Sequence, residues 1–341
     1  MKQIEIHGAT KSSTILIGEC LKNLSNYIPS QDVVLITDKT VSEYYQKDFP
    51  KFRTITIGTG EHIKTLDTAG LIYQELLTMD AQRSTFIVGI GGGIVCDLTG
   101  FVASTFLRGV RFGFVSSTLL SQVDASVGGK NGVNFKGFKN MVGVFNQPEF
   151  VICDLDLLKT LPEKELLCGF AEVVKHALIE DRDLFTFIEN NAAKALALDH
   201  VVLERFVHDS VVIKSSVVNR DEKEKGERRK LNFGHTFGHA IEKTTGIPHG
   251  EAVSLGMVLA ASLSVRKQLL SEEEFHRITR LLKNLKLPTV LEYDKREVMD
   301  ALKKDKKREG DLIHFVLING IGKSVIAEIS IQELTRMIES H

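Results

Sequence analysis

Three histidines lie close together in this chain, and histidine is a common ligand of catalytic metals. His235, His239 and His249 fall within fifteen residues, in the segment KLNFGHTFGHAIEKTTGIPHGEA. On a helix, His235 and His239 would share a face because they are four residues apart. Gly246 and Pro248 favour a turn that returns His249 toward them. Imidazoles and one carboxylate are typical of a catalytic Zn²⁺ site with an open coordination position.

A carboxylate that could complete this site lies upstream, in GFAEVVKHALI. Glu172, Lys175 and His176 belong to one predicted helix, and the neighbours of Glu172 are mostly apolar. A carboxylate buried there is costly without a partner, so we expect it to contact a metal or a cation. A salt bridge to Lys175 is the alternative to a metal. The zinc-protease motif is not met, because HTFGH lacks a glutamate after its first histidine.

A second kind of site is indicated by VGIGGGIVCD, in which a predicted strand runs into a glycine turn. Gly91, Gly92 and Gly93 would let backbone N–H groups approach a pyrophosphate at the start of a helix. In the usual dinucleotide fingerprint an acid follows the glycines by about twenty residues. Here Asp38 precedes them and Asp97 follows closely. The alternative is a tight turn without a ligand. A nucleotide site and a metal site together indicate redox chemistry on a hydroxyl-bearing substrate.

Two polar segments favour the nucleotide site. Glu61 and Lys64 follow a predicted strand, where ligands collect in open α/β sheets. The second segment, residues 116–140, is rich in glycine and also carries Asp124, Lys130, Lys139 and Asn140. A surface loop would explain its glycines, but not isolated charges among apolar residues.

The composition is that of a soluble globular protein, with 43% hydrophobic and 26% charged residues. A length of 341 residues suits two domains. The formal net charge of −1 gives no general attraction to nucleic acid or anionic membranes, so an anionic substrate needs a local cationic cluster. The four cysteines show no paired spacing, which favours reduced thiols in the cytoplasm. We expect no signal peptide and no membrane span.

The elements that position these residues change character near residue 160. Before it, apolar runs predict strands, with helices between them at 64–78 and 94–106; the strands are at 33–38, 53–58, 84–90, 111–118 and 150–155. Such alternation predicts a mainly parallel α/β sheet covered on both faces. Residues 1–160 should therefore form an α/β domain.

After Pro162 the apolar spacing is mostly helical. Helices are expected at 163–180, 183–198, 201–218, 252–269 and 271–285, with strands only at 312–318 and 324–329. Residues 161–341 should therefore form a mostly α-helical domain. The charged run 219–230 alone predicts a solvated loop.

Several segments together resemble 3-dehydroquinate synthase. They include GGGIVCDLTGFVAST, QVDASVGGKNGVN, LLKTLPEKELLCGFAEVVKHALI and LNFGHTFGHAIE, in order between about residues 30 and 325. The resemblance implies a Rossmann-like NAD-binding domain followed by a helical domain that binds metal and substrate. It implies conversion of 3-deoxy-D-arabino-heptulosonate 7-phosphate to 3-dehydroquinate and phosphate in the shikimate pathway, with NAD and divalent Zn or Co. A cytoplasmic homodimer acting on a small sugar phosphate, without nucleic-acid or membrane partners, is expected.

The same resemblance implies roles for individual residues of the site. The implied metal ligands are Glu172, His235 and His249. His239 then faces the substrate, although the helical spacing alone could make both His235 and His239 metal ligands. The other implied substrate contacts are Asp124, Lys130, Asn140, Lys175, Lys214, Arg228, Asn232 and, of the lysines in DKK, Lys306 in preference to Lys307. Because Arg228 lies within it, the charged run 219–230 would be an active-site loop.

The positions implied to contact NAD are spread over the first domain. They are Asp38, Glu61, Lys64, Gly92, Gly93, Ile94, Val95, Asp97, Ser117, Thr118, Lys130, Lys139, Leu157, Leu158, Lys159 and Thr160. The chain departs from the family at Cys96, where glycine is usual, at Thr59, where Asp is common, and at Phe135, where His is common. These departures concern the NAD contacts and a loop, and they spare the metal ligands.

The implied reaction has no net redox change. NAD takes a hydride from the substrate, phosphate leaves by β-elimination, the hydride returns and an intramolecular aldol reaction closes the ring. The metal lowers the pKa of the hydroxyl that is oxidised, and lysines with Arg228 hold the carboxylate and phosphate.

Three other functions were weighed against this one. A metal-dependent polyol or alcohol dehydrogenase shares the architecture, but a neutral substrate needs no cationic cluster. Another sugar phosphate cyclase would use a different substrate, and GHTFGHA with Lys139 and Asn140 favours dehydroquinate synthase. A regulatory nucleotide-binding protein would not need three metal ligands.

Overall fold

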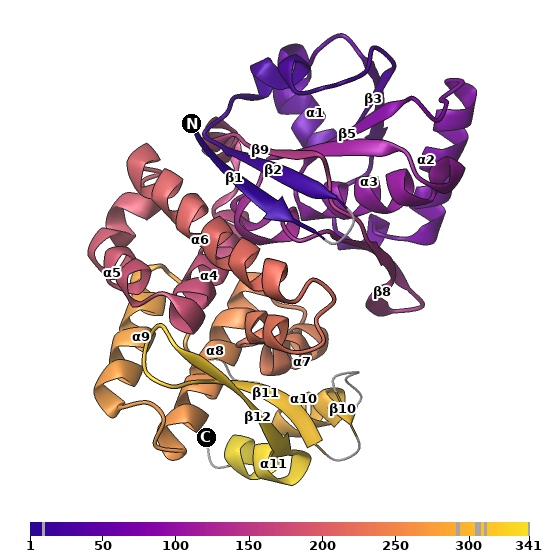
Figure 1. Ribbon diagram of the computed structural model, residues 1–341. Coiled ribbons are helices and arrows are strands. Elements are labelled where there is room, and N and C mark those ends of the chain that lie inside the picture. Colours follow the sequence, from indigo (N-terminus) through magenta and orange to yellow (C-terminus); the bar gives the residue numbers. More distant parts are fainter. Residues whose placement is uncertain (9–10, 291–293, 304–307, 310–311, 340–341) are drawn as a thin grey trace. The chain divides into compact units, whose positions relative to one another are not determined.

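The computed structural model describes residues 1–8, 11–290, 294–303, 308–309 and 312–339 (Figure 1). Contacts within the chain define two compact units, Met1–Pro162 with Leu203–Glu222, and Glu163–Val202 with Lys223–His341. The sequence analysis places all residues after 160 in the second domain, whereas the contacts place Leu203–Glu222 with the first unit.

A seven-stranded sheet forms the centre of the first unit, in the order β1-β2-β9-β6-β5-β3-β4. Its strands are β1 (Lys2–His7), β2 (Ser12–Ile17), β3 (Val33–Asp38), β4 (Arg53–Ile57), β5 (Phe86–Gly91), β6 (Arg111–Ser116) and β9 (Phe150–Cys153). Strands β1 and β2 are antiparallel, and all other neighbours are parallel. The mainly parallel sheet is confirmed, whereas the β1–β2 hairpin was not predicted.

The central strands are buried on both faces, which explains their continuous apolar sequences. Val34, Leu35 and Ile36 of β3 are fully buried, as are Ile87 and Val88 of β5. Helices α1 (Lys39–Tyr45), α2 (Leu66–Thr78) and α3 (Gly93–Thr105) lie alongside the sheet (Figure 1). From β3 the chain passes to β4 on one side and then to β5 on the other. Ligands in such sheets bind beyond the strand carboxyl ends at this switch point.

A separate two-stranded hairpin, β7 (Lys130–Phe135) and β8 (Phe138–Phe145), belongs to the same unit. Its turn residues Lys136 and Gly137 have φ of 47° and 80°, which suits a tight turn between twisted strands. The sequence analysis predicted a polar glycine-rich segment here and no strands. Phe135, one of the departures from the family, faces Phe138 across this turn.

The second unit is mostly helical, as predicted. Its helices are α4 (Glu163–Glu180), α5 (Arg182–Leu196), α7 (His235–Thr245), α8 (His249–Arg266), α9 (Glu272–Asn284), α10 (Lys295–Lys303) and α11 (Ile331–Glu339). Most of α6 (His200–Arg220) belongs to the first unit. Strands β10 (Arg308–Glu309), β11 (Leu312–Ile318) and β12 (Ser324–Ser330) lie near α10 and α11 (Figure 1). Among the described residues, no helix has both the length and the apolar character needed to cross a membrane.

Candidate metal and nucleotide sites

One carboxylate oxygen in the second unit faces two imidazoles. Nε2 of His235 and Nε2 of His249 each lie 3.4 Å from Oε1 of Glu172. One ligand atom from each of these residues lies within 4.8 Å of the other two. Glu172 is fully buried on α4, while the histidines occupy the first positions of α7 and α8. Helix α4 and the consecutive helices α7 and α8 thus bring together the three residues expected to bind metal.

The second nitrogen of each imidazole has an acceptor of its own. Nδ1 of His235 lies 3.1 Å from the carbonyl oxygen of Phe233, and Nδ1 of His249 lies 3.3 Å from Oε2 of Glu242. A carbonyl oxygen only accepts, so Nδ1 of His235 carries its hydrogen and Nε2 keeps a lone pair on the side of Glu172. Such outer hydrogen bonds orient histidine ligands in metal sites. The donor set therefore fits a divalent cation such as Zn²⁺ or Co²⁺.

Glycines let α7 and α8 approach closely enough to present these ligands together. A Cβ on Gly256 would overlap the carbonyl oxygen of Gly234, and a Cβ on Gly238 would lie 3.0 Å from the carbonyl oxygen of Ala252. Gly234 also has a φ of 77°, a left-handed conformation at the residue before α7. The glycines of FGHTFGHA thus have a packing role that explains their spacing.

The two interpretations of Glu172 prove compatible. Lys175 forms an ion pair with Oε2, whereas the imidazoles face Oε1 of the same carboxylate. Lys175 is only 2% exposed, so this cation is held away from bulk water. A buried ammonium beside the expected metal ligands is suited to hold an anionic group.

His239 lies one turn beyond His235 on α7. Its ring centre is 5.1 Å from that of His235 and 6.1 Å from that of His249. Its ligand atoms group with those of Glu242 and His249, and not with Glu172. The structure thus separates His239 from the cluster formed by Glu172, His235 and His249.

The charged run 219–230 contains more than solvated side chains. Its residues 227–230 belong to the short helix η7 (Glu227–Asn232), and Arg228 is only 2% exposed. Asn232 donates from Nδ2 to Oε1 of Glu224 at 2.6 Å. Burial of a guanidinium requires compensating partners, which a freely mobile loop would not supply. The expected substrate positions Arg228 and Asn232 therefore lie in an ordered segment of the second unit.

Two other expected substrate residues meet within the first unit. Nζ of Lys214 lies 2.7 Å from Oδ1 of Asp124 and 2.6 Å from its carbonyl oxygen. Lys214 comes from the part of α6 that belongs to this unit, and Asp124 from η5 (Ser121–Ala125). The pair fixes the ammonium of a nearly buried lysine.

Most residues expected to bind NAD follow the carboxyl ends of four parallel strands. Asp38 ends β3, Gly92 and Gly93 follow β5, Ser117 and Thr118 follow β6, and Leu157–Thr160 lie in η6 (Leu155–Thr160) after β9. Because these strands are parallel, their carboxyl ends share one edge of the sheet. The side chains of Leu157 and Leu158 are buried, so these two residues would offer backbone atoms to a ligand.

The glycine turn after β5 has no room for side chains. A Cβ on Gly91 would lie 2.5 Å from Cγ2 of Val95, and a Cβ on Gly92 would lie 2.9 Å from Cγ2 of Thr118. Cys96 is accommodated beside it, because its thiol is buried and lies 3.9 Å from the carbonyl oxygen of Gly91. This departure from the family therefore leaves the turn intact.

A polar network joins the nucleotide positions to the hairpin. Lys64 pairs with Asp97 and donates to Oδ1 of Asn140 at 2.6 Å. Asn134 accepts from the backbone N–H of Asn140 at 2.9 Å and donates to Oε1 of Glu61 at 2.8 Å. Burial raises the pKa of Asp97, although the charge and hydrogen bond of Lys64 oppose the shift. Asn134 was not among the predicted site residues, and its only signal in the sequence is its place in a glycine-rich polar segment.

Asp38 caps the N-terminus of α1. Its Oδ1 accepts from the backbone N–H of Val41 at 2.9 Å, and burial raises the pKa of the Asp38 carboxyl group.

The remaining expected lysines lie at the surface where the structure describes them. Lys130 and Lys139 are exposed on the hairpin, whereas Lys159 pairs with Asp156 on the surface at 2.7 Å. Lys306 and Lys307 lie outside the described residues.

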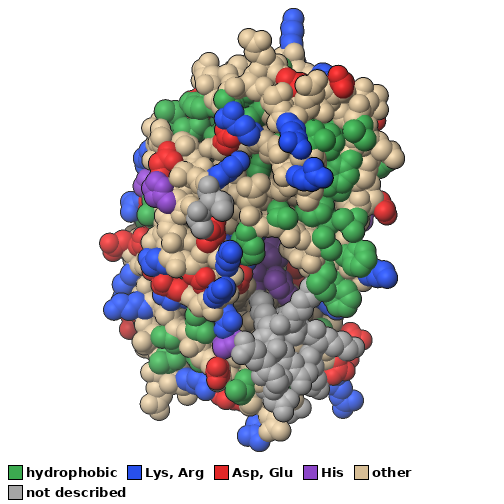
Figure 2. Space-filling model, turned by 45° about the vertical axis from the view of Figure 1, so that its right-hand side comes forward, with side chains coloured by type: hydrophobic (Ala, Val, Ile, Leu, Met, Phe, Trp, Pro, Cys, Tyr) green, Lys and Arg blue, Asp and Glu red, His purple; other side chains and the backbone are tan. Residues whose placement is uncertain are grey.

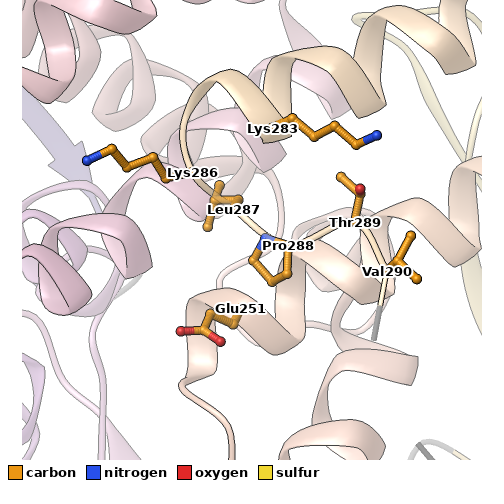
Figure 3. Close-up of a pocket in the computed structure, with 7 residues that line it drawn as sticks. All are labelled: Glu251, Lys283, Lys286, Leu287, Pro288, Thr289 and Val290. Carbon is orange, nitrogen blue, oxygen red and sulfur yellow. The ribbon is translucent and has the colours of Figure 1, made fainter. Parts of the chain in front are cut away.

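Two surface hollows lie away from these positions. One is lined by Glu251, Lys283, Lys286, Leu287, Pro288, Thr289 and Val290 (Figure 3). Its lysines point in different directions in Figure 3, and Lys286 pairs with Glu163 at 2.5 Å. The other lies near the first residues of β3 and β4, at the end of the sheet opposite the carboxyl ends of its parallel strands. On the face in Figure 2, acidic and basic side chains are intermixed, as the net charge of −1 suggests.

Comparison with known proteins agrees with this geometry. A family model described as 3-dehydroquinate synthase N-terminal matches residues 54–168, and one described as 3-dehydroquinate synthase C-terminal matches residues 169–308. The 3-dehydroquinate synthase of Coxiella burnetii (strain CbuG_Q212) is 39% identical, with 99% of each chain covered. That of Acetivibrio thermocellus is 41% identical over 94% of this chain and 92% of its own.

The chain belongs to the 3-dehydroquinate synthase family.

Solved structures of other enzymes share the fold of this chain. A 2-deoxy-scyllo-inosose synthase, solved with carbaglucose-6-phosphate, NAD⁺ and Co²⁺, is 28% identical with a TM-score of 0.88 over 99% of this chain and all of that one. The 2-epi-5-epi-valiolone synthase of Streptomyces hygroscopicus is 24% identical with a TM-score of 0.89, over 98% of this chain and 97% of its own. A probable glycerol dehydrogenase from Sinorhizobium meliloti, at 14% identity and a TM-score of 0.68 over 96% of this chain and 95% of its own, shares the fold alone.

Proposed function

We propose that this chain converts 3-deoxy-D-arabino-heptulosonate 7-phosphate to 3-dehydroquinate and phosphate, as a phosphorus–oxygen lyase of the shikimate pathway. Family membership and relatives about 40% identical over nearly the whole chain support this activity over that of another cyclase, because the solved 2-deoxy-scyllo-inosose synthase is only 28% identical. A sugar phosphate is accordingly the class of substrate.

We assign the metal to Glu172, His235 and His249. The observation that carries this assignment is the approach of both Nε2 atoms to one buried carboxylate oxygen at 3.4 Å. NAD is assigned to the carboxyl edge of the parallel sheet, around Asp38 and Gly92. When bound, the metal supplies a Lewis acid for the substrate hydroxyls, and NAD accepts and returns a hydride.

The cationic residues of the chain bind and orient the substrate in this proposal. Lys175 is buried beside Glu172, and Lys214 is held by Asp124. Ammonium and guanidinium groups kept from water bind carboxylate and phosphate more strongly than exposed ones do. The other residues assigned to the substrate are Lys130, Asn140, Arg228, Asn232, His239 and Lys306.

The test is to measure phosphate release from the heptulosonate phosphate together with the absorbance of NADH. We expect phosphate release that requires NAD⁺ yet leaves no lasting NADH absorbance, because the hydride is returned. A chelator should abolish phosphate release, and Co²⁺ or Zn²⁺ should restore it. Lasting NADH formation from a simple polyol, without phosphate release, would instead indicate a dehydrogenase.

We further propose a cytoplasmic homodimer. The family resemblance supports this assembly, and light scattering of the purified protein measures it directly. A mass of one chain, 37.9 kDa, at working concentration would contradict it.

A further inference from the structure

Helix α7 carries three side chains on one face that concern the metal site. His235, His239 and Glu242 are spaced by four and then three residues, so they lie one above another on a helix. His235 is an assigned ligand. Oε2 of Glu242 lies 3.3 Å from Nδ1 of His249, the other assigned histidine ligand. One helix thus supplies a ligand and also the outer partner of a ligand on the next helix.

His249 is held by a carboxylate on each of its nitrogens. Nε2 lies 3.4 Å from Oε1 of Glu172, and Nδ1 lies 3.3 Å from Oε2 of Glu242. The side chain of Glu242 is 14% exposed, so its charge is only weakly screened by water. His235 differs, because the acceptor at its Nδ1 is a neutral backbone carbonyl.

We propose that Glu242 is a positioning residue that holds His249 with Nδ1–H toward its own carboxylate and the Nε2 lone pair toward the metal. The proposal rests on the metal assignment made above. A carboxylate at Nδ1 fixes the tautomer and the ring orientation, and it makes Nε2 a stronger donor to the metal. Loss of such an outer partner typically weakens metal binding by about 10- to 100-fold.

The same cluster allows one competing arrangement. Ligand atoms of His239, Glu242 and His249 also lie within 4.8 Å of one another. A cation bound there would take Nδ1 of His249, since that nitrogen faces Glu242. Nδ1 cannot hold both a hydrogen and a cation, so positioning by Glu242 and cation binding by this second cluster exclude each other.

The experiment is a titration of the metal-free protein with Co²⁺, followed by its visible absorption, which reports ligand number and geometry. We expect one Co²⁺ per chain in the unaltered protein. Glu242→Ala should bind it about 10- to 100-fold more weakly with an altered spectrum. Glu242→Gln should lie between the two, because its amide oxygen still accepts from Nδ1–H but carries no charge. Circular dichroism of the metal-free variants verifies that each is folded.

Two matched variants distinguish the possible results. His235→Gln removes an assigned ligand, and His239→Gln removes only the third member of the competing cluster. If His235→Gln loses Co²⁺ while Glu242→Ala binds it with unchanged affinity and spectrum, the positioning role is wrong and the metal assignment stands. If His235→Gln also binds Co²⁺ normally, both are wrong. A second Co²⁺ per chain that is lost in His239→Gln and in Glu242→Ala would overturn the proposal in favour of cation binding.

Discussion

Gly250 and Cys168 lie so close together that a Cβ on Gly250 would overlap the Cα of Cys168. The N–H of Gly250 also lies 3.4 Å from Sγ of Cys168. Gly250 follows the assigned ligand His249 on α8, and Cys168 precedes Glu172 by one helical turn on α4. This contact therefore sets the separation of two metal ligands.

Gly250→Ala should push the start of α8 away from α4. We expect the free energy of unfolding to fall by about 1–3 kcal/mol through overpacking, and metal affinity to fall with it because His249 moves from Glu172. Urea unfolding and a Co²⁺ titration measure the two effects. Gly70→Ala in α2 is the matched control, since a Cβ there meets nothing within 4 Å. Its expected effect is a gain of up to about 1 kcal/mol from helix propensity, and equal effects of both substitutions would contradict this explanation.

Metal binding should release a proton from His249. Burial lowers the pKa of this imidazole, but its hydrogen bonds to the carboxylates of Glu172 and Glu242, together with their negative charges, outweigh burial and raise the pKa to about 9. Below that pH the metal-free imidazole is protonated, whereas a ligand must be neutral. Binding heats at neutral pH should therefore differ between phosphate and Tris buffers, whose heats of ionisation differ. The difference in binding heat between the two buffers should shrink as the pH rises toward 9, because less of the metal-free imidazole is then protonated. Identical heats in both buffers at neutral pH would show that no proton leaves.

Lys64 should stabilise the nucleotide side of the first unit. Lys64→Met leaves Asp97 as a nearly buried carboxylate without its cation, which should cost about 3 kcal/mol of unfolding free energy. The double variant Lys64→Met with Asp97→Asn should recover most of this loss, because the charge is then removed as well. The control is Lys22→Met, whose ammonium is exposed and lies 3.5 Å from Asp48. Its expected effect is at most about 1 kcal/mol. A similar loss in both lysine variants would argue against a special role for Lys64.

Thiol reactivity should be confined to Cys20. Cys96, Cys153 and Cys168 are buried, and burial raises the pKa of Cys168 to about 11, so little thiolate forms at neutral pH. Cys20 is only partly buried, although burial raises its pKa too. An aromatic disulfide reagent should label one thiol slowly in the native protein and all four after unfolding. Labelling that persists in Cys20→Ser would disprove this.

Much of the fold could be predicted because its strands are buried on both faces. The apolar runs at β3 and β5 and the helical spacing of α4 are continuous signals of burial. The hairpin β7–β8 gave no such signal, because β8 is largely exposed and its sequence mixes glycine, lysine and phenylalanine. Its Lys136–Gly137 turn depends on positive φ at both residues, which the sequence suggests only weakly.

The candidate site, like the fold, could be predicted from the sequence only in part. The three histidines and Glu172 stand out because imidazoles cluster and a carboxylate sits among apolar residues. Glu242 does not stand out, because a glutamate on an amphipathic helix is usually solvated. Only the packing of α7 against α8 brings it to Nδ1 of His249. In the same way, the contact of Lys214 with Asp124 joins residues 90 positions apart, which one sequence cannot pair.

The central claim is that Glu172, His235 and His249 bind the divalent metal. Anomalous diffraction at the cobalt edge, from crystals of the Co²⁺-loaded protein, tests it most directly. The account predicts one strong peak at about 2.0–2.2 Å from an oxygen of Glu172 and from Nε2 of both histidines. A peak bound by other residues, with these three side chains away from it, would contradict the account.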